Sequence, residues 1–232
     1  MRKWNFSPGP ATIPEDVLLE VQSELLEFNN SGISIMEMSH RTELYSSIAY
    51  EAKKDLIEIL NIPDNYEVLF LQGGATHQFS MIPMNFSHLK GKPAYITTGT
   101  WTKRAFEEGS KITEIDQIFS SENENFIYAP HFKDLKIPED ASYVHYCPNE
   151  TIHGVAFDHI PTINNPLVAD MSSSILSEPI DVNKFSLIYA SAQKNIGPSG
   201  LTVVIIKKSF MKQGNQTLTN LLKYSEHSKQ DS

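Results

Sequence analysis

Two ionisable residues stand at the ends of apolar segments of the sequence. Asp170 closes the apolar run 167–170, and Lys194 follows the apolar run 187–190. A carboxylate at the end of a buried strand is costly unless it is paired, hydrated or used. A lysine that is taken out of water has a lowered pKa and can form a Schiff base. The alternatives are a helix-capping role for Asp170 and a solvated surface charge for Lys194.

Two further stretches could hold a ligand. The turn Gly73-Gly74 follows the apolar run 67–71 and precedes a helical pattern. Such a turn offers free backbone N–H groups and the positive end of a helix dipole to an anion, and Thr76 adds a hydroxyl. Trp101 follows another apolar run and a glycine, and offers a flat aromatic face. The alternatives are a tight connection without a ligand and a tryptophan of the core or its rim.

These four features together meet the needs of one cofactor. Pyridoxal phosphate requires a lysine for covalent attachment, an acid beside its pyridine nitrogen and a phosphate site. A flat residue stacked on its ring helps to hold it. The acid keeps the ring nitrogen protonated and strengthens the ring as an electron sink. We therefore expect Lys194, Asp170, the Gly73-Gly74 turn and Trp101 to converge on one site.

The elements that would position these residues follow from hydrophobic periodicity. Helices are predicted over 14–28, 42–60 and about 76–85. Short apolar runs predict strands over 67–71, 94–98, 115–119, 143–146, 167–170, 187–190 and 201–206. This alternation predicts an α/β fold with a mainly parallel sheet and helices on both faces. Ligands of such sheets gather at the carboxyl ends of the strands.

The apolar residues of the first two predicted helices recur at helical spacing. In the first helix they are Val17, Leu18, Val21, Leu25 and Phe28. In the second they are Leu44, Ile48, Ala52, Leu56 and Ile59, which lie on one face.

Composition excludes several classes of protein. The 232 residues include 19 basic and 28 acidic residues, a formal net charge of −9 that disfavours generic nucleic-acid binding. The single Cys147 excludes an internal disulfide framework and fits a reducing cytoplasm. The eight histidines are scattered without metal-ligand spacing, so no metal site is expected. No apolar run approaches the ~20 residues of a membrane span, and the N-terminus does not read as a secretory signal.

Six short strings occur in an order and spacing that resemble one enzyme family. They are NFSPGPA at 5–11, MEMSHR at 36–41, FLQGGA at 70–75, NETIHG at 149–154, VADMSS at 168–173 and AQKNIGP at 192–198. Through these strings the chain resembles the phosphoserine aminotransferases, which are pyridoxal-phosphate enzymes of fold type I, class V. The resemblance covers about the first 210 residues and implies the large domain of that fold.

The resemblance implies a role for each matching residue around the cofactor. Lys194 resembles the lysine that bonds the cofactor and moves protons at the substrate Cα, and Asp170 the partner of the pyridine nitrogen. Trp101 resembles the residue stacked on the ring. Thr151 resembles the hydroxyl donor to the phenolic oxygen. The positions that resemble the phosphate-binding residues are Ala75, Thr76 and Gln193.

Two residues resemble the part of the family's site that reads the substrate. Arg41 resembles the arginine that binds the distal anion, which is a phosphate in one substrate and a carboxylate in the other. A guanidinium group suits both anions. His40 lies beside it, with either a substrate-binding or a purely structural role.

The resemblance implies an amino transfer in serine biosynthesis. Glutamate would leave as 2-oxoglutarate, and 3-phosphohydroxypyruvate would leave as O-phosphoserine. It also implies a cytoplasmic homodimer and, in some bacteria, a second use in pyridoxine (vitamin B6) synthesis. The alternatives are another fold-type I enzyme and a truncated, catalytically impaired paralogue that acts as a dimerising partner.

The resemblance also implies a division of the chain. Residues 1–15 would form an N-terminal segment, 16–210 the cofactor-binding large domain, and 211–232 a polar tail. Family members are longer and carry a small C-terminal domain with further substrate-binding groups. We therefore expect this chain to bind the cofactor and to turn over slowly on its own.

Overall fold

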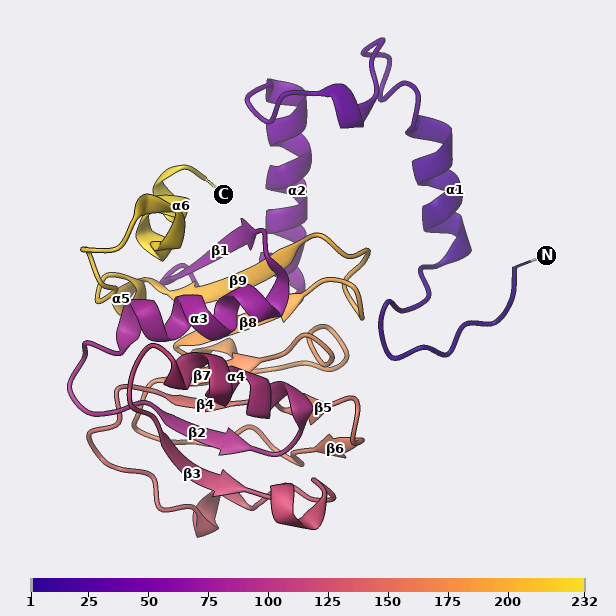
Figure 1. The fold of residues 1–232 in the computed structure, drawn as a ribbon. Helices are drawn as coiled ribbons and strands as arrows, with labels where there is room; N and C mark the ends of the chain where they lie inside the picture. Colours follow the sequence, from indigo (N-terminus) through magenta and orange to yellow (C-terminus); the bar gives the residue numbers. More distant parts are fainter. Residues whose placement is uncertain (1, 232) are drawn as a thin grey trace.

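A single sheet organises the computed structural model, which describes residues 2–231 (Figure 1). Its strand order is β1-β9-β8-β7-β4-β2-β3. The strands are β1 (Tyr66–Leu71), β2 (Ala94–Thr97), β3 (Asp116–Ser120), β4 (Val144–Tyr146), β7 (Leu167–Asp170), β8 (Leu187–Ser191) and β9 (Thr202–Lys207). A separate pair of two-residue strands, β5 (Asn149–Glu150) and β6 (Val155–Ala156), forms a hairpin beyond β4.

Strand direction divides the sheet into two parts. The pairings from β3 through β2, β4 and β7 to β8 are parallel. The pairings of β8 with β9 and of β9 with β1 are antiparallel. The segment 192–201 between β8 and β9 is shorter than the dozen or so residues that a parallel crossover needs, so β9 returns antiparallel. The prediction of a mainly parallel sheet is confirmed, with this antiparallel edge added.

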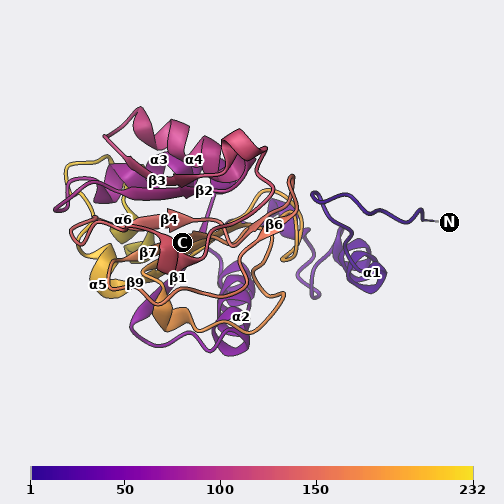
Figure 2. The same cartoon turned by 90° about the horizontal axis from the view of Figure 1, so that it is seen from below.

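Helices cover both faces of the sheet, as predicted (Figure 2). Helices α3 (Gly74–Phe86) and α4 (Thr100–Ser110) lie on one face, and α2 (Glu43–Ile59) lies on the other. The remaining helices are α1 (Glu15–Glu24), α5 (Lys208–Met211) and α6 (Tyr224–Lys229). Within residues 2–231, no helix is both long and apolar enough to cross a membrane.

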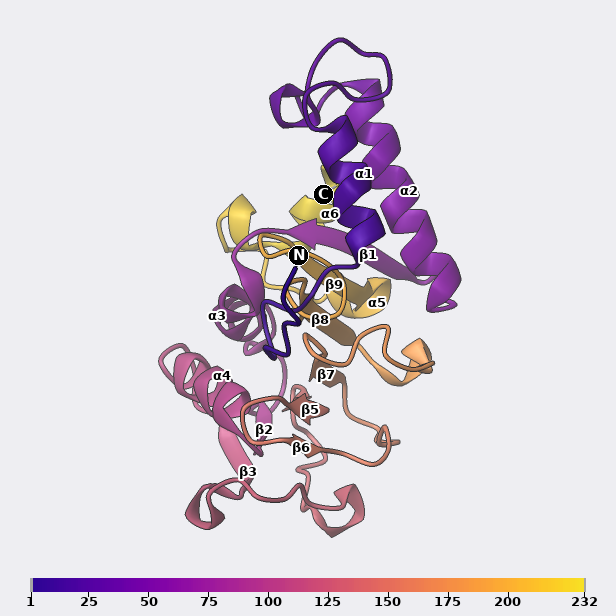
Figure 3. The ribbon, with the colours of Figure 1, turned by 90° about the vertical axis from the view of Figure 1, so that its right-hand side faces the viewer.

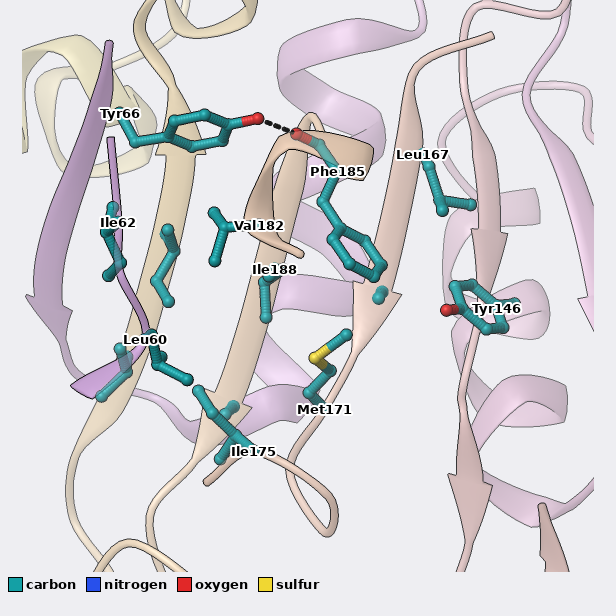
Figure 4. Packing of buried hydrophobic residues seen from close by; sticks show 14 of the residues in the cluster. Leu60, Ile62, Tyr66, Tyr146, Leu167, Met171, Ile175, Val182, Phe185 and Ile188 are labelled. Atoms are coloured by element: carbon teal, nitrogen blue, oxygen red, sulfur yellow. Dashed lines mark hydrogen bonds between the residues drawn. The ribbon is translucent and has the colours of Figure 1, made fainter. Parts of the chain in front are cut away.

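Each face of the sheet has its own hydrophobic cluster. On the α2 face, Leu60 and Ile62 pack with residues from β1, β7 and β8, and the Tyr66 hydroxyl donates a hydrogen bond to the Phe185 carbonyl at 2.6 Å (Figure 4). On the α3 face, Phe86 of α3 stacks on Phe210 of α5 and on Tyr224 of α6. The two clusters bury both faces of the sheet whose strand ends carry the candidate site residues.

The N-terminal region departs from the predicted helix faces. Helix α1 ends at Glu24 instead of Phe28, and Val17, Leu18, Val21 and Leu25 are 37–55% exposed. The N-terminal parts of the fold, α1 and the start of α2, stand clear of the sheet (Figures 1 and 3).

The predicted face of α2 is only partly buried for the same reason. Leu56 is buried and Leu44 and Ile48 are half-buried, whereas Ala52 and Ile59 are exposed. The helix touches the sheet only near its C-terminal end, so periodicity identified the helix but not the extent of its contact.

The last segment is folded against the sheet domain. The Tyr224 side chain is buried, and its hydroxyl donates a hydrogen bond to Gln78 Oε1 of α3 at 2.6 Å. Met211 and Tyr224 of this segment thus contribute to the core, although its composition is polar. The domain boundaries at 15 and 210 stay predictions.

Candidate active site

A cavity of about 410 Å³ opens at the carboxyl ends of the parallel strands. Its walls come from the starts of α3 and α4, the ends of β4 and β7, and the segment that follows β8. The lining residues are Gly74, Ala75, Thr76, Trp101, Cys147, Asn149, Asp170, Ser172, Ser173, Ser191, Gln193, Lys194, Ser199 and Gly200. This is the place where α/β sheets bind ligands.

Six of the residues expected at the cofactor line this cavity: Ala75, Thr76, Trp101, Asp170, Gln193 and Lys194. Thr151 lies beside them and contacts both Lys194 and Trp101. The structure does not bring His40 and Arg41 to the cavity: both are exposed, just before α2. Their role in binding a distal anion stays a prediction.

Lys194 is half-buried and closely held. Its Nζ donates a hydrogen bond to Thr151 Oγ1 at 2.6 Å and lies 5.4 Å from the Trp101 ring centroid. Burial lowers the pKa of Lys194, and the negative charges of Asp170 and Glu150 act against that shift. A lysine with a lowered pKa has more of the neutral amine that attacks a carbonyl.

The N-terminal loop reaches the same lysine. The Ala11 N–H donates a hydrogen bond to the Gln193 carbonyl at 2.8 Å. A Cβ added at Gly9 would stand 3.1 Å from Lys194 Cγ, which is tighter than nine in ten real Cβ contacts. Gly9 and Ala11 of the string 5–11, to which sequence reasoning gave no role in the site, therefore lie against Lys194 and Gln193.

Asp170 is buried at the end of β7, beside Tyr189 of β8. Its Oδ1 accepts hydrogen bonds from the Ser172 N–H at 3.0 Å and from the Ser172 hydroxyl at 2.7 Å. Burial raises the pKa of Asp170, and the bonds from Ser172 reduce that shift. The carboxylate is thus fixed in place and gains from a positive partner in the cavity.

An anion site is formed where α3 begins. Gly73 and Gly74 have φ angles of 90° and 66°, a left-handed conformation that favours glycine. Gly73 is the N-cap and no side chain caps the helix, and the first residues of α3, Gly74, Ala75 and Thr76, line the cavity. Free N–H groups and the helix dipole favour an anion here.

Sequence reasoning missed several residues of the site, although they lie within the strings it identified. Ser172 and Ser173 follow Asp170, and Asn149 precedes Thr151 by two positions. Glu150 is fully buried beneath Trp101 and is hydrogen-bonded to it. Their neighbours Asp170 and Thr151 were the signal that could have pointed to them.

The cavity combines an amine, a carboxylate, an anion site and an aromatic plate. It can hold an aromatic ring that carries a phosphate group and an aldehyde. Across residues 2–231, no group of three histidine, cysteine, aspartate or glutamate residues could hold a metal ion.

Comparison with known proteins gives one consistent result. Residues 3–221 match the family described as Aminotransferase class-V. The chain is 50% identical over 232 residues to phosphoserine aminotransferase of Bacillus cereus ATCC 10987, and 45% identical to that of Hahella chejuensis. Both matches cover all of this chain and 64% of the relative, so the chain spans about two thirds of the length of these curated relatives.

Solved structures show the same fold. The phosphoserine aminotransferase of Bacillus circulans subsp. alkalophilus superposes with a TM-score of 0.95 at 42% identity, over 100% of this chain and 64% of that one. The pyridoxal-phosphate-bound phosphoserine aminotransferase of Trichomonas vaginalis gives 0.93 at 36% identity, over 99% and 65%. An aspartate aminotransferase from Thermus thermophilus shares the fold at 18% identity, with a TM-score of 0.72. The predicted fold-type I architecture is confirmed, and the chain belongs to the class-V aminotransferase family.

Proposed function

We propose that this chain carries the cofactor site of a phosphoserine aminotransferase. The reaction is a pyridoxal-phosphate-dependent amino transfer between glutamate and 3-phosphohydroxypyruvate, yielding 2-oxoglutarate and O-phosphoserine in serine biosynthesis. One observation carries the proposal: Lys194, Asp170, Trp101 and the start of α3 meet in one cavity. The identity of about 50% to relatives of that name supports the choice of substrates.

The residues present fit pyridoxal phosphate. The N–H groups at the start of α3, with Thr76 and Gln193, would hold the phosphate. Asp170 would lie at the pyridine nitrogen, where a protonated ring would add a positive partner to this buried carboxylate. Trp101 would cover the ring, and Thr151 would donate to its phenolic oxygen.

The chain's own residues divide the work around the bound cofactor. When bound, pyridoxal phosphate supplies an electron sink and carries the amino group between the substrates. Lys194 would hold the cofactor covalently and would move the proton at the substrate Cα, since its lowered pKa favours the neutral amine that both roles need. Ser172 holds the Asp170 carboxylate in position.

We also propose that two copies of the chain form a cytoplasmic homodimer. The exposed apolar residues of α1 support an interface there. His40 and Arg41 lie away from their own cavity, so in this proposal they serve a distal anion site that a second copy completes. A further use in pyridoxine synthesis stays a prediction.

The proposed function has a direct spectroscopic test. Addition of pyridoxal phosphate should give a new absorption band, and borohydride should then fix the cofactor to the peptide that contains Lys194. Lys194→Ala should give no such band, whereas the exposed control Lys212→Ala should behave as the native chain. A band that survives in Lys194→Ala would contradict the proposal.

The choice of substrate is tested with the same absorption measurement. Glutamate or O-phosphoserine should discharge the lysine-dependent band, whereas alanine, which has no distal anion, should do so at least tenfold more slowly. Equal rates with alanine would instead favour another fold-type I enzyme.

A further inference from the structure

Glu150 of β5 is a charged residue with no exposed surface. Its Oε2 accepts a hydrogen bond from the backbone N–H of Trp101 at 3.0 Å. Its Oε1 accepts from the Thr102 N–H at 2.8 Å and from the Thr102 hydroxyl at 2.7 Å. All three donors belong to the first turn of α4, where free N–H groups and the helix dipole stabilise an anion. A buried carboxylate bonded in this way has one position, because any shift leaves it unpaired.

The groups that Glu150 holds are the groups that contact Lys194. Trp101 presents its ring to Lys194 Nζ at 5.4 Å. Thr151, the residue after Glu150, accepts hydrogen bonds from Lys194 Nζ at 2.6 Å and from Trp101 Nε1 at 3.3 Å. Glu150 therefore joins the start of α4 to the β5 hairpin, and each of these two elements carries a residue that contacts Lys194.

Gly99 provides a second, independent observation. A Cβ added at Gly99 would stand 2.4 Å from Glu150 Cδ and 2.6 Å from Oε2. The φ angle of Gly99 is 179°, an extended conformation open to any residue, so its backbone does not require glycine. The glycine instead leaves the space that the Glu150 carboxylate fills.

We propose that Glu150 is a positioning residue of the cofactor site, whose carboxylate sets where Trp101 and Thr151 stand around Lys194. Because it is fully buried, Glu150 acts through these neighbours and not on a ligand. The identity of the cofactor rests on the proposed function, whereas the arrangement of the three residues around Lys194 does not.

The negative charge of Glu150 also affects the pKa of Lys194. It is one of the negative groups that raise the pKa of this lysine against the effect of burial. Removal of the charge by Glu150→Gln should therefore lower the pKa of Lys194 further, since the protonated amine loses a favourable partner.

The first test needs no cofactor. The lysines of the chain are reductively methylated with ¹³C, and the Lys194 signal is identified by its loss in Lys194→Arg. In an NMR titration of the cofactor-free chain, Glu150→Gln should shift the Lys194 titration to lower pH. Tyr224→Phe is the matched control, because it removes a buried hydrogen bond at a distance from this site. An unchanged Lys194 titration in Glu150→Gln would overturn the proposal.

The second test follows Trp101 itself, in a Trp4→Phe background that leaves one tryptophan. Pyridoxal phosphate should quench Trp101 fluorescence in the native chain. In Glu150→Gln the side-chain NH₂ must face either the Trp101 backbone N–H or the Thr102 donors, so the first turn of α4 shifts and moves Trp101 with it. Quenching should fall and cofactor affinity should weaken about tenfold, the usual effect of losing a charged hydrogen bond. Native quenching and affinity in this variant would overturn the proposal.

The third test uses the contact with Gly99. Gly99→Ala keeps the carboxylate but displaces it, so it should weaken cofactor binding about tenfold when Glu150 is present. In a Glu150→Ala background the same substitution should have little further effect, because the clash is gone. Simple additivity of the two changes would contradict the proposal. Should Glu150→Gln fail to fold, Gly99→Ala carries the tryptophan test as well.

The outcomes separate the two proposals. A native chain that takes up no pyridoxal phosphate contradicts the proposed function, and the lysine titration still decides the role of Glu150. If the native chain takes up the cofactor normally and Glu150→Gln leaves the Lys194 titration unchanged, only the inference about Glu150 is contradicted.

Discussion

Asp170 is buried, and burial favours its neutral, protonated form over the charged carboxylate. Burial raises its pKa above the ordinary 3.8, and the two hydrogen bonds from Ser172 offset only part of that shift. Between 3.8 and the raised value, the folded chain binds more protons than the unfolded chain. The contribution of Asp170 to stability therefore falls as the pH rises through this window, and at neutral pH the charge destabilises the cofactor-free chain.

The variant Asp170→Asn should separate stability from function. At pH 7 it should raise the melting temperature of the cofactor-free chain, because it keeps an oxygen acceptor for Ser172 and removes the buried charge. The gain should shrink as the pH is lowered through the raised pKa of Asp170, because the native carboxyl group then also becomes neutral. Amino transfer should fall about 10²–10³-fold, as when one preorganised electrostatic partner is removed. A lower melting temperature at pH 7, measured by calorimetry, would contradict this account.

The sequence located residues of the cavity where the signal is local, and their roles stay predictions. Lys194 and Asp170 each follow an apolar run, and a strand end in an α/β sheet is enough to place them at the ligand edge. Glu150 gave no such signal, because its partners Trp101 and Thr102 are 49 and 48 positions away in the chain. His40 and Arg41 are prominent in the sequence, but the fold of one chain leaves them outside the cavity.

At the scale of elements, apolar runs located the seven sheet strands to within one or two residues. They did not give the direction of β9, which depends on the length of the connection after β8 and not on the pattern within the strand. For helix α1, the sequence pattern does not give the contacts of the element. Its periodicity predicts a helix with an apolar face but cannot say whether this chain covers that face.

Helix α6 should depend on one hydrogen bond to α3. Tyr224→Phe removes the donor to Gln78 Oε1 and leaves a buried acceptor without it, a change that costs about 1–3 kcal/mol. Urea unfolding should show this loss of free energy, whereas the exposed control Tyr50→Phe should stay within about 0.5 kcal/mol of the native chain. Equal stabilities of Tyr224→Phe and the native chain would show that α6 is not held this way.

At the scale of the whole molecule, the apolar residues of α1 lead to a prediction about assembly. Sedimentation velocity at micromolar concentration should give twice the mass of one chain. The double variant Val21→Glu, Leu25→Glu should sediment as a folded monomer, because the side chains of Val21 on α1 and of Leu25 directly after it are both exposed in a single chain. Gln22→Glu, on the same helix and also exposed, is the charge control and should stay dimeric. A native chain that sediments as a monomer would rule out the proposed interface.

The pairing of β1 with β9 affects how the chain folds while it is being synthesised on the ribosome. Leu71 ends β1, and its partner Thr202 is synthesised about 130 residues later. At about 5–20 residues per second, β1 waits on the order of ten seconds for the strand that completes it. During that interval its apolar edge is unpaired, which is the kind of surface that chaperones shield from aggregation.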